Sequence, residues 1–77
     1  MEANRVAIRA FRERMGYSRG DAANRTNGRV SRRYWAYIED GERDPRPAVL
    51  KAIAEALEVP LAAIARFSDQ YSDEDAA

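Results

Sequence analysis

The chain contains no cysteine and no histidine. Without cysteine it has no disulfides and no thiolate metal sites, and without histidine it lacks the commonest general base and metal ligand. It also has no long apolar run, so the sequence predicts no membrane-spanning helix. The N-terminus has no apolar signal core, which predicts a cytoplasmic location. At 77 residues, the chain is expected to form one domain at most.

Lysine is nearly absent, since Lys51 is the only one, and the net charge is zero. The charges are unevenly distributed, however. Between residues 5 and 33 the only acidic residues are Glu13 and Asp21, whereas the cations are Arg5, Arg9, Arg12, Arg14, Arg19, Arg25, Arg29, Arg32 and Arg33. A neutral molecule can therefore present one strongly positive side. Arginine suits bidentate contacts to phosphate and guanine, although a GC-rich genome also produces an excess of arginine.

The first third of the chain predicts two helices. Apolar residues at three- and four-residue spacing indicate an amphipathic helix that begins near Asn4 and ends at Gly16. Residues 1–3, before it, are expected to be frayed. Ser18 and Asp21 then form the pattern of a capping box, in which each side chain meets a free backbone amide of the helix start. This second helix is expected to bury Ala22, Ala23 and Thr26.

A turn and a third helix follow. Asn27 and Gly28 both tolerate positive φ, so the segment ending in Arg29 predicts a turn. Ser31 is a good N-cap, and Gly41 is a typical residue just after a helix C-terminus. Between them, Trp35 and Ile38 lie on one face, which predicts that they anchor the helix to a core.

The remaining sequence predicts two more helices and a tail. Pro47 suits the first turn of a helix whose apolar stripe continues to Leu57. Pro60 is expected to begin a last short helix. The segment 68–77 is acidic and has little to bury, which predicts a loose tail. The expected fold is therefore all-α: a compact five-helix bundle over residues 4–67 that contains a helix-turn-helix.

Catalysis has little support in the sequence. Carboxylates, arginine and tyrosine can perform acid–base chemistry, but no pattern places two carboxylates opposite each other. The chain has no glycine-rich phosphate loop and no metal motif. We therefore expect neither an enzyme nor a cofactor.

Three stretches in order resemble the lambda-repressor-like, Cro/C1-type (Xre) helix-turn-helix family, over residues 8–67. The stretches read IRAFRERMGYS from residue 8, VSRRYWAYIEDG from residue 30 and PRPAVLKAIAEAL from residue 45, followed by VPLAAI. The chain departs from the family in a longer turn before Val30, in the bulk of Trp35, in Arg46 where a capping Ser or Asp is common, and in Glu58 where Gly is common. The longer turn predicts a changed angle of the third helix or a position of Arg29 against the DNA backbone.

The resemblance implies a fold with the third helix in the DNA major groove, and it implies roles for individual residues. Base edges would be read by Ser31, Arg32, Arg33 and Tyr37. Phosphates would be contacted by Arg12, Arg19, Arg29, Tyr34, Arg43 and Arg46. Arg12 and Glu39 match a pair that forms an inter-helix salt bridge in relatives. Each tyrosine has an alternative, because Tyr34 and Tyr37 also suit packing against the core.

The leading interpretation is a sequence-specific DNA-binding transcriptional regulator of bacterial or phage type, acting as a repressor in the cytoplasm and associated with the nucleoid. Its partners would be double-stranded DNA and, as in many relatives, a second copy on a pseudo-palindromic site, paired through Phe67 and Tyr71. The alternative is an antitoxin-like or phage regulatory protein that acts mainly by binding another protein. The acidic segment from Asp69 to Asp75 would suit a basic protein partner.

Overall fold

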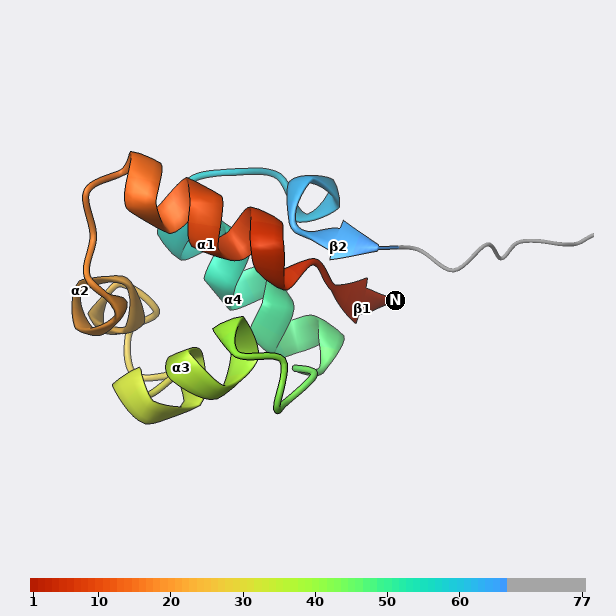
Figure 1. The fold of residues 1–77 in the computed structure, drawn as a ribbon, viewed down its shortest axis with the longest axis horizontal. Helices are drawn as coiled ribbons and strands as arrows, with labels where there is room; N and C mark the ends of the chain where they lie inside the picture. The colour runs from red at the N-terminus through yellow and green to blue at the C-terminus, as the bar shows by residue number, and fades with distance from the viewer. Residues whose placement is uncertain (67–77) are drawn as a thin grey trace, which may run out of the picture.

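Four α-helices and a small antiparallel sheet make up residues 1–66, which are the part of the chain described by the computed structural model (Figure 1). The elements in order are β1 (Glu2–Ala3), α1 (Arg5–Arg14), α2 (Arg19–Asn24), α3 (Arg32–Glu39), α4 (Pro47–Leu57), the 3₁₀ turn η1 (Leu61–Ala63) and β2 (Ala65–Arg66). The predicted helical domain with a helix-turn-helix is confirmed, but the prediction of five helices is wrong. The predicted acidic tail, 68–77, lies outside the described residues.

The two ends of the described chain pair with each other. The segment after Pro60, predicted to be a fifth helix, forms the single 3₁₀ turn η1 and then strand β2, which pairs antiparallel with β1. Asn4 donates its backbone N–H to the carbonyl of Ile64 at 2.8 Å, and Ala3 donates to Asp44 Oδ1 at 3.0 Å. One helical turn gains few internal hydrogen bonds for the residues that it orders, so pairing with the other end of the chain satisfies the backbone better. The expectation that residues 1–3 are frayed is also wrong.

The core lies where all four helices meet. Trp35 is fully buried, as the sequence predicts, and it is the largest side chain in the core. Ala22 and Ala23 of α2 are also buried, and their small side chains leave room for the indole. The other buried hydrophobic residues of this cluster are Ile8, Val30, Ile38, Leu50, Ile53, Ala54, Leu57 and Ile64.

Local hydrogen bonds fix the relation between α2 and α3. The capping box predicted at Ser18 and Asp21 is present, and Ser31 caps α3 by accepting the Tyr34 N–H at 3.0 Å. The turn also has the predicted positive φ values, 59° at Asn27 and 84° at Gly28. Inside the turn, the buried Thr26 hydroxyl donates to the Ala23 carbonyl at 2.6 Å and accepts the Val30 N–H at 3.0 Å. The buried Thr26 side chain therefore stabilises the turn between α2 and α3.

Helix α4 shows the physical consequence of two departures from the family pattern. Arg46 stands at its N-cap without a side-chain hydrogen bond, and Pro47 fills the first helical position, where no N–H is needed. At the other end, Glu58 takes the left-handed conformation with φ 59°. That conformation suits glycine, and in an L-residue it costs about 1–2 kcal/mol.

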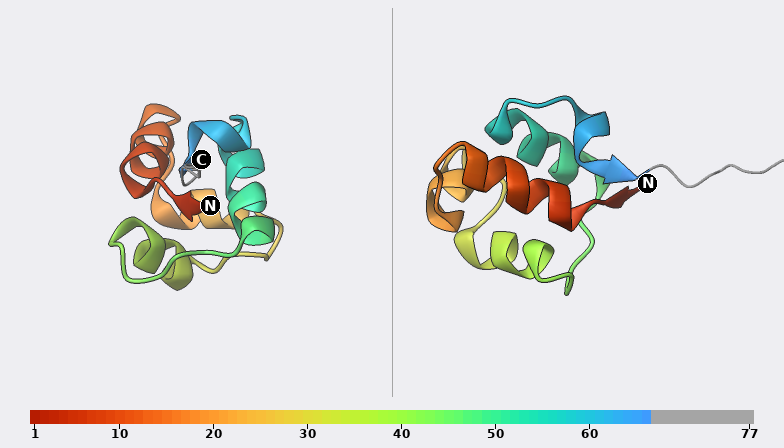
Figure 2. Two further views of the ribbon diagram at one scale, coloured as in Figure 1. Left: turned by 90° about the vertical axis from the view of Figure 1, so that its right-hand side faces the viewer. Right: turned by 45° about the horizontal axis from the view of Figure 1, so that its top comes forward.

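Helix α3 lies at an outer edge of the bundle, as the views in Figures 1 and 2 show. It packs against α1 and α2 through its buried residues Trp35, Ile38 and Glu39. Its first two residues, Arg32 and Arg33, are exposed. The fold thus presents the start of α3 to solvent while burying the middle and end of its inner face.

Candidate functional site

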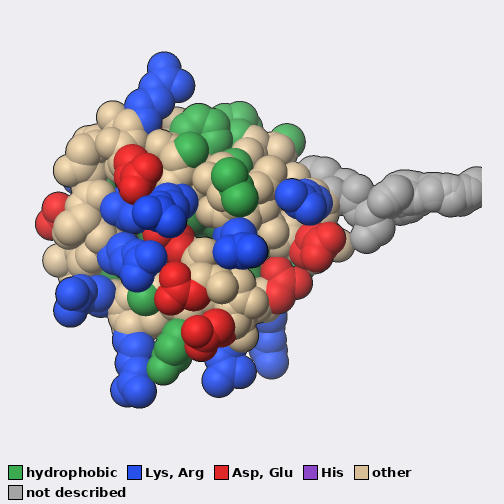
Figure 3. All heavy atoms as spheres, viewed as in Figure 1, with side chains coloured by type: hydrophobic (Ala, Val, Ile, Leu, Met, Phe, Trp, Pro, Cys, Tyr) green, Lys and Arg blue, Asp and Glu red, His purple; other side chains and the backbone are tan. Residues whose placement is uncertain are grey.

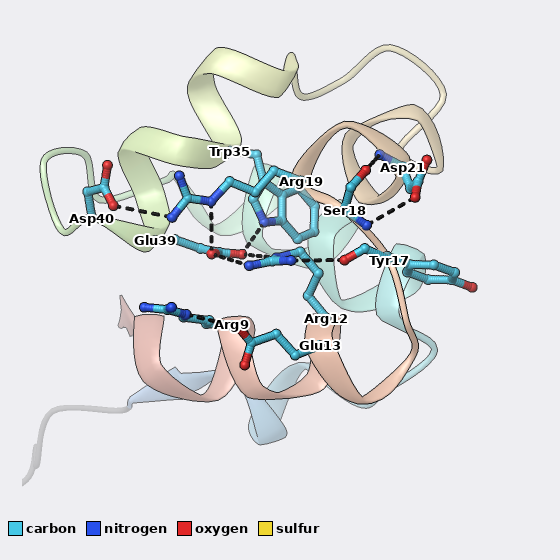
Figure 4. A network of polar contacts seen from close by, with 10 residues as sticks. All are labelled: Arg9, Arg12, Glu13, Tyr17, Ser18, Arg19, Asp21, Trp35, Glu39 and Asp40. Atoms are coloured by element: carbon cyan, nitrogen blue, oxygen red, sulfur yellow. Dashed lines mark hydrogen bonds and ion pairs between the residues drawn. The ribbon is translucent and has the colours of Figure 1, made fainter.

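The carboxylate of Glu39 is the centre of a buried polar network that joins three helices (Figure 4). Its Oε2 accepts from Arg12 Nε at 2.6 Å and from Trp35 Nε1 at 2.6 Å. Its Oε1 accepts from Arg12 Nη2 at 2.9 Å and from Arg19 Nε at 3.3 Å. Arg12 also donates through Nη1 to the Tyr17 carbonyl at 2.9 Å. The structure therefore brings the predicted pair Arg12–Glu39 together in bidentate geometry, which fixes α3 against α1.

This network perturbs both of its main ionisable groups. The hydrogen bond to Glu39 raises the pKa of Arg12 above its ordinary value, against the effect of burial. Burial raises the pKa of Glu39, but hydrogen bonds from Arg12 and Trp35 and the positive charges of Arg12 and Arg19 outweigh burial. The pKa of Glu39 therefore lies below its ordinary value, and the carboxylate is ionised at neutral pH.

Arg19 begins α2 and reaches toward the C-terminal end of α3. Besides Glu39, its guanidinium meets Asp40, with Nη2 3.4 Å from Oδ1. The Arg19 side chain is 35% exposed, so it remains accessible from solvent. The residue predicted to contact phosphate is thus held by two carboxylates of α3 and its cap.

A hollow of about 420 Å³ lies where the N-terminal ends of α2 and α3 meet, lined by Arg19, Arg32, Arg33 and Ala36. No carboxylate lines it. Arg19 is paired with Glu39 and Asp40, but Arg32 and Arg33 form no ion pair within residues 1–66, so the hollow carries net positive charge. Gly20 lies beside Arg32, since a Cβ added there would be 3.4 Å from Arg32 Cδ. Figure 3 shows Arg and Lys side chains projecting along the edge of the molecule where α3 lies in Figure 1.

Tyr37 organises the arginines beside this hollow. Its hydroxyl accepts from Arg33 Nε at 3.0 Å, and the guanidinium carbons of Arg33 and Arg43 lie 5.8 and 5.9 Å from the centre of its ring. Its carbonyl accepts the Glu42 N–H at 2.9 Å and the Arg43 N–H at 3.3 Å, which fixes the loop after α3. Tyr37 is half-buried, and it connects the start of α3 to the loop beyond its end.

The other predicted site residues divide by exposure. Arg29, Arg32, Arg43 and Arg46 are exposed and form no ion pair within residues 1–66. Tyr34 is partly buried and packs against the core. Arg12 is 8% exposed and bonded to Glu39, so it lies inside the bundle and not among these exposed arginines. Ser31, Arg29 and Arg32 lie at or before the start of α3, and Arg43 and Arg46 lie in the segment after its end.

Of the contacts in this network, the sequence predicts only the pair Arg12–Glu39. The hydrogen bond from Trp35 to Glu39 joins positions four apart in one helix. Side chains at this spacing are neighbours on a helix surface, so the sequence indicates that the two can meet. The contact of Arg19 with Asp40 spans 21 residues, and no local pattern indicates it. Within residues 1–66 no cluster of acidic side chains is placed to hold a metal ion. The helices of that region are also too short and too polar to cross a membrane.

Comparison with known families identifies the arrangement. Residues 6–67 match a family model described as a helix-turn-helix domain. The chain belongs to this family. The resemblance to Xre- and Cro/C1-like proteins is thus confirmed. Membership in the helix-turn-helix family implies DNA binding, and the family is typically non-enzymatic. No curated protein and no solved structure matches the chain significantly.

Proposed function

We propose that this helix-turn-helix protein is a sequence-specific transcriptional regulator that represses by occupying a promoter. The observation that carries the proposal is the hollow lined by Arg19, Arg32 and Arg33 beside the exposed start of α3. A short helix with an exposed basic edge and a buried inner face has the dimensions to enter the major groove. Phosphates on either side would meet Arg29, Arg43 and Arg46, which set orientation.

The base-reading role falls mainly on Arg32 and Arg33. A guanidinium binds guanine through two parallel hydrogen bonds to O6 and N7. Tyr37 already accepts from Arg33 Nε at 3.0 Å, and this leaves the two terminal nitrogens of Arg33 for a base. Ser31 keeps its hydroxyl proton available for a base edge or a phosphate, since its oxygen accepts from the helix. The preferred site would therefore contain guanine in each half.

Two copies on a pseudo-palindromic site would place their α3 helices about one helical turn, ~34 Å, apart. The surface predicted for this pairing, Phe67 and Tyr71, lies outside the described residues. A nucleoid-associated, cytoplasmic location follows from the same proposal. The alternative of a protein-binding antitoxin depends on the acidic segment after Ser68, which is also outside them, and no contact within residues 1–66 favours it.

Selection of bound duplexes from a random library tests the proposal. We expect one enriched, guanine-containing motif, bound by wild-type protein with strong salt dependence. The double variant R32A/R33A should lose preference at those guanines, at about 1–3 kcal/mol for each contact.

The matched control for this selection is R14A. Arg14 is exposed and lines a different hollow, with Phe11 and Val59. This variant loses one positive charge but should keep the motif. Unchanged sequence preference in R32A/R33A would refute the proposed reading, and absence of any enriched motif for the wild type would refute sequence-specific regulation.

A further inference from the structure

Asp40 occupies a position that helix stability does not explain. It is the C-cap residue of α3, where the helix dipole favours cations and disfavours a carboxylate. Its side chain is 47% exposed, and among residues 1–66 its one ion-pair partner is Arg19, with Nη2 3.4 Å from Oδ1. The contact with Arg19, and not the stability of the helix, therefore accounts for a carboxylate at this position.

Arg19 contacts both Glu39 and Asp40, at 3.3 and 3.4 Å, but within residues 1–66 Asp40 has no other cationic partner. Glu39 already receives two hydrogen bonds from Arg12 and one from Trp35, all at 2.6–2.9 Å. A carboxylate has about four acceptor positions, so Arg19 takes the last one, at 3.3 Å. Glu39 is therefore shared between Arg12 and Arg19, whereas Asp40 pairs with Arg19 alone within residues 1–66.

Arg19 also belongs to the arginine-lined hollow, where Arg32 and Arg33 have no acidic partner within residues 1–66. We propose that Asp40 is a positioning residue that holds Arg19 toward the C-terminal end of α3 and competes with a DNA phosphate for its guanidinium. The inference rests on the proposed function, because the phosphate belongs to the duplex read by α3. It assigns Asp40 the role of limiting affinity.

The long, partly exposed contact sets the size of the effect. Exposed ion pairs are worth about 0.2–1 kcal/mol, so removing the Asp40 contact of Arg19 should strengthen DNA binding about 1.4- to fivefold. A newly engaged phosphate should also steepen the log–log dependence of affinity on salt by about one unit. A purely structural role for Asp40 would leave this salt slope unchanged.

The test compares D40N with E42Q on the selected duplex by fluorescence anisotropy over a salt series. Both variants remove one carboxylate charge. Glu42 is exposed, lies two residues further on, and forms no ion pair within residues 1–66. E42Q therefore measures the general effect of lost negative charge. D40E, which keeps the charge, should bind like wild type, and the same comparison in an R19A background should show D40N and E42Q to be equivalent.

A larger gain for D40N than for E42Q, with a steeper salt slope, supports the proposal if R19A abolishes the difference. Equal affinities of D40N and E42Q, a loss of affinity in D40N, or a gain that persists without Arg19 would each overturn it. A wild-type protein that selects no duplex overturns the proposed function, and this inference with it. Normal wild-type selection combined with equivalent D40N and E42Q overturns the inference alone.

Discussion

Replacing Glu39 by glutamine should destabilise the domain severely without creating a cavity. The amide is nearly the same size as the carboxylate, but it offers one oxygen instead of two. If its NH₂ replaces Oε2, Arg12 Nε and Trp35 Nε1 lose their acceptor; if it replaces Oε1, Arg12 Nη2 and Arg19 Nε lose theirs. Either orientation therefore leaves two donors facing a donor, and it leaves Arg12 buried without a counter-charge.

The expected loss follows from these two costs. A hydrogen bond to a charged group contributes about 1.5–3 kcal/mol, and removing one partner of a buried ion pair costs about 3–5 kcal/mol. The two figures describe the same loss, so we expect E39Q to lower the free energy of unfolding by about 3–5 kcal/mol. For a domain of 77 residues the total is about 4–12 kcal/mol, so this single change removes a large share of it.

Urea unfolding followed by far-UV circular dichroism measures the effect, because the substitution alters the surroundings of Trp35 and would confuse a fluorescence signal. The matched control is E13Q. Glu13 also pairs with an arginine, Arg9 at 3.2 Å, but the two side chains are 55% and 61% exposed. Such a pair is worth about 0–1 kcal/mol. If E39Q loses no more stability than E13Q, the buried network does not hold α3 as described.

Three further outcomes are expected in urea unfolding. The pKa of Glu39 is lower in the folded state, so its stabilisation is fully present above the unfolded pKa of about 4.3 and is lost as pH falls through the folded value. The difference in free energy of unfolding between wild type and E39Q should therefore narrow from pH 7 to pH 3. A constant difference would contradict this. T26V should lose about 1–3 kcal/mol, because the buried Val30 N–H loses its acceptor, and a loss below about 0.5 kcal/mol would argue against that role. E58G should raise the free energy of unfolding by about 0.5 kcal/mol, because glycine adopts the positive φ without strain. This figure already subtracts the entropy cost of glycine and the loss of the exposed contact with Arg25. E58A, which keeps the strain, should show no such gain.

Features with local chemistry were predictable from the sequence. The capping box at Ser18 and Asp21 and the turn at Asn27 and Gly28 depend on residues within a few positions of each other. The buried place of Trp35 followed from its spacing with Ile38. For the same reason the four helices could be placed before any tertiary contact was known.

Features that depend on distant parts of the chain were not predictable. Strands β1 and β2 have two residues each, which is too short for an alternating pattern, and 61 residues separate them. Arg19 could be assigned to phosphate from its position, but its contact with Asp40 arises only when α2 and α3 pack together. The base- and phosphate-contacting roles remain predictions, since they concern a duplex.

The interleaving of exposed and buried residues in α3 has a consequence for how this protein can change. Trp35, Ile38 and Glu39 carry the packing of the helix, whereas Arg32 and Arg33 make none of the core contacts. Substitution at the exposed positions therefore leaves the free energy of unfolding nearly unchanged. Under the proposed reading of DNA by α3, new sequence preferences are therefore accessible to mutation or design without a preceding stabilising change.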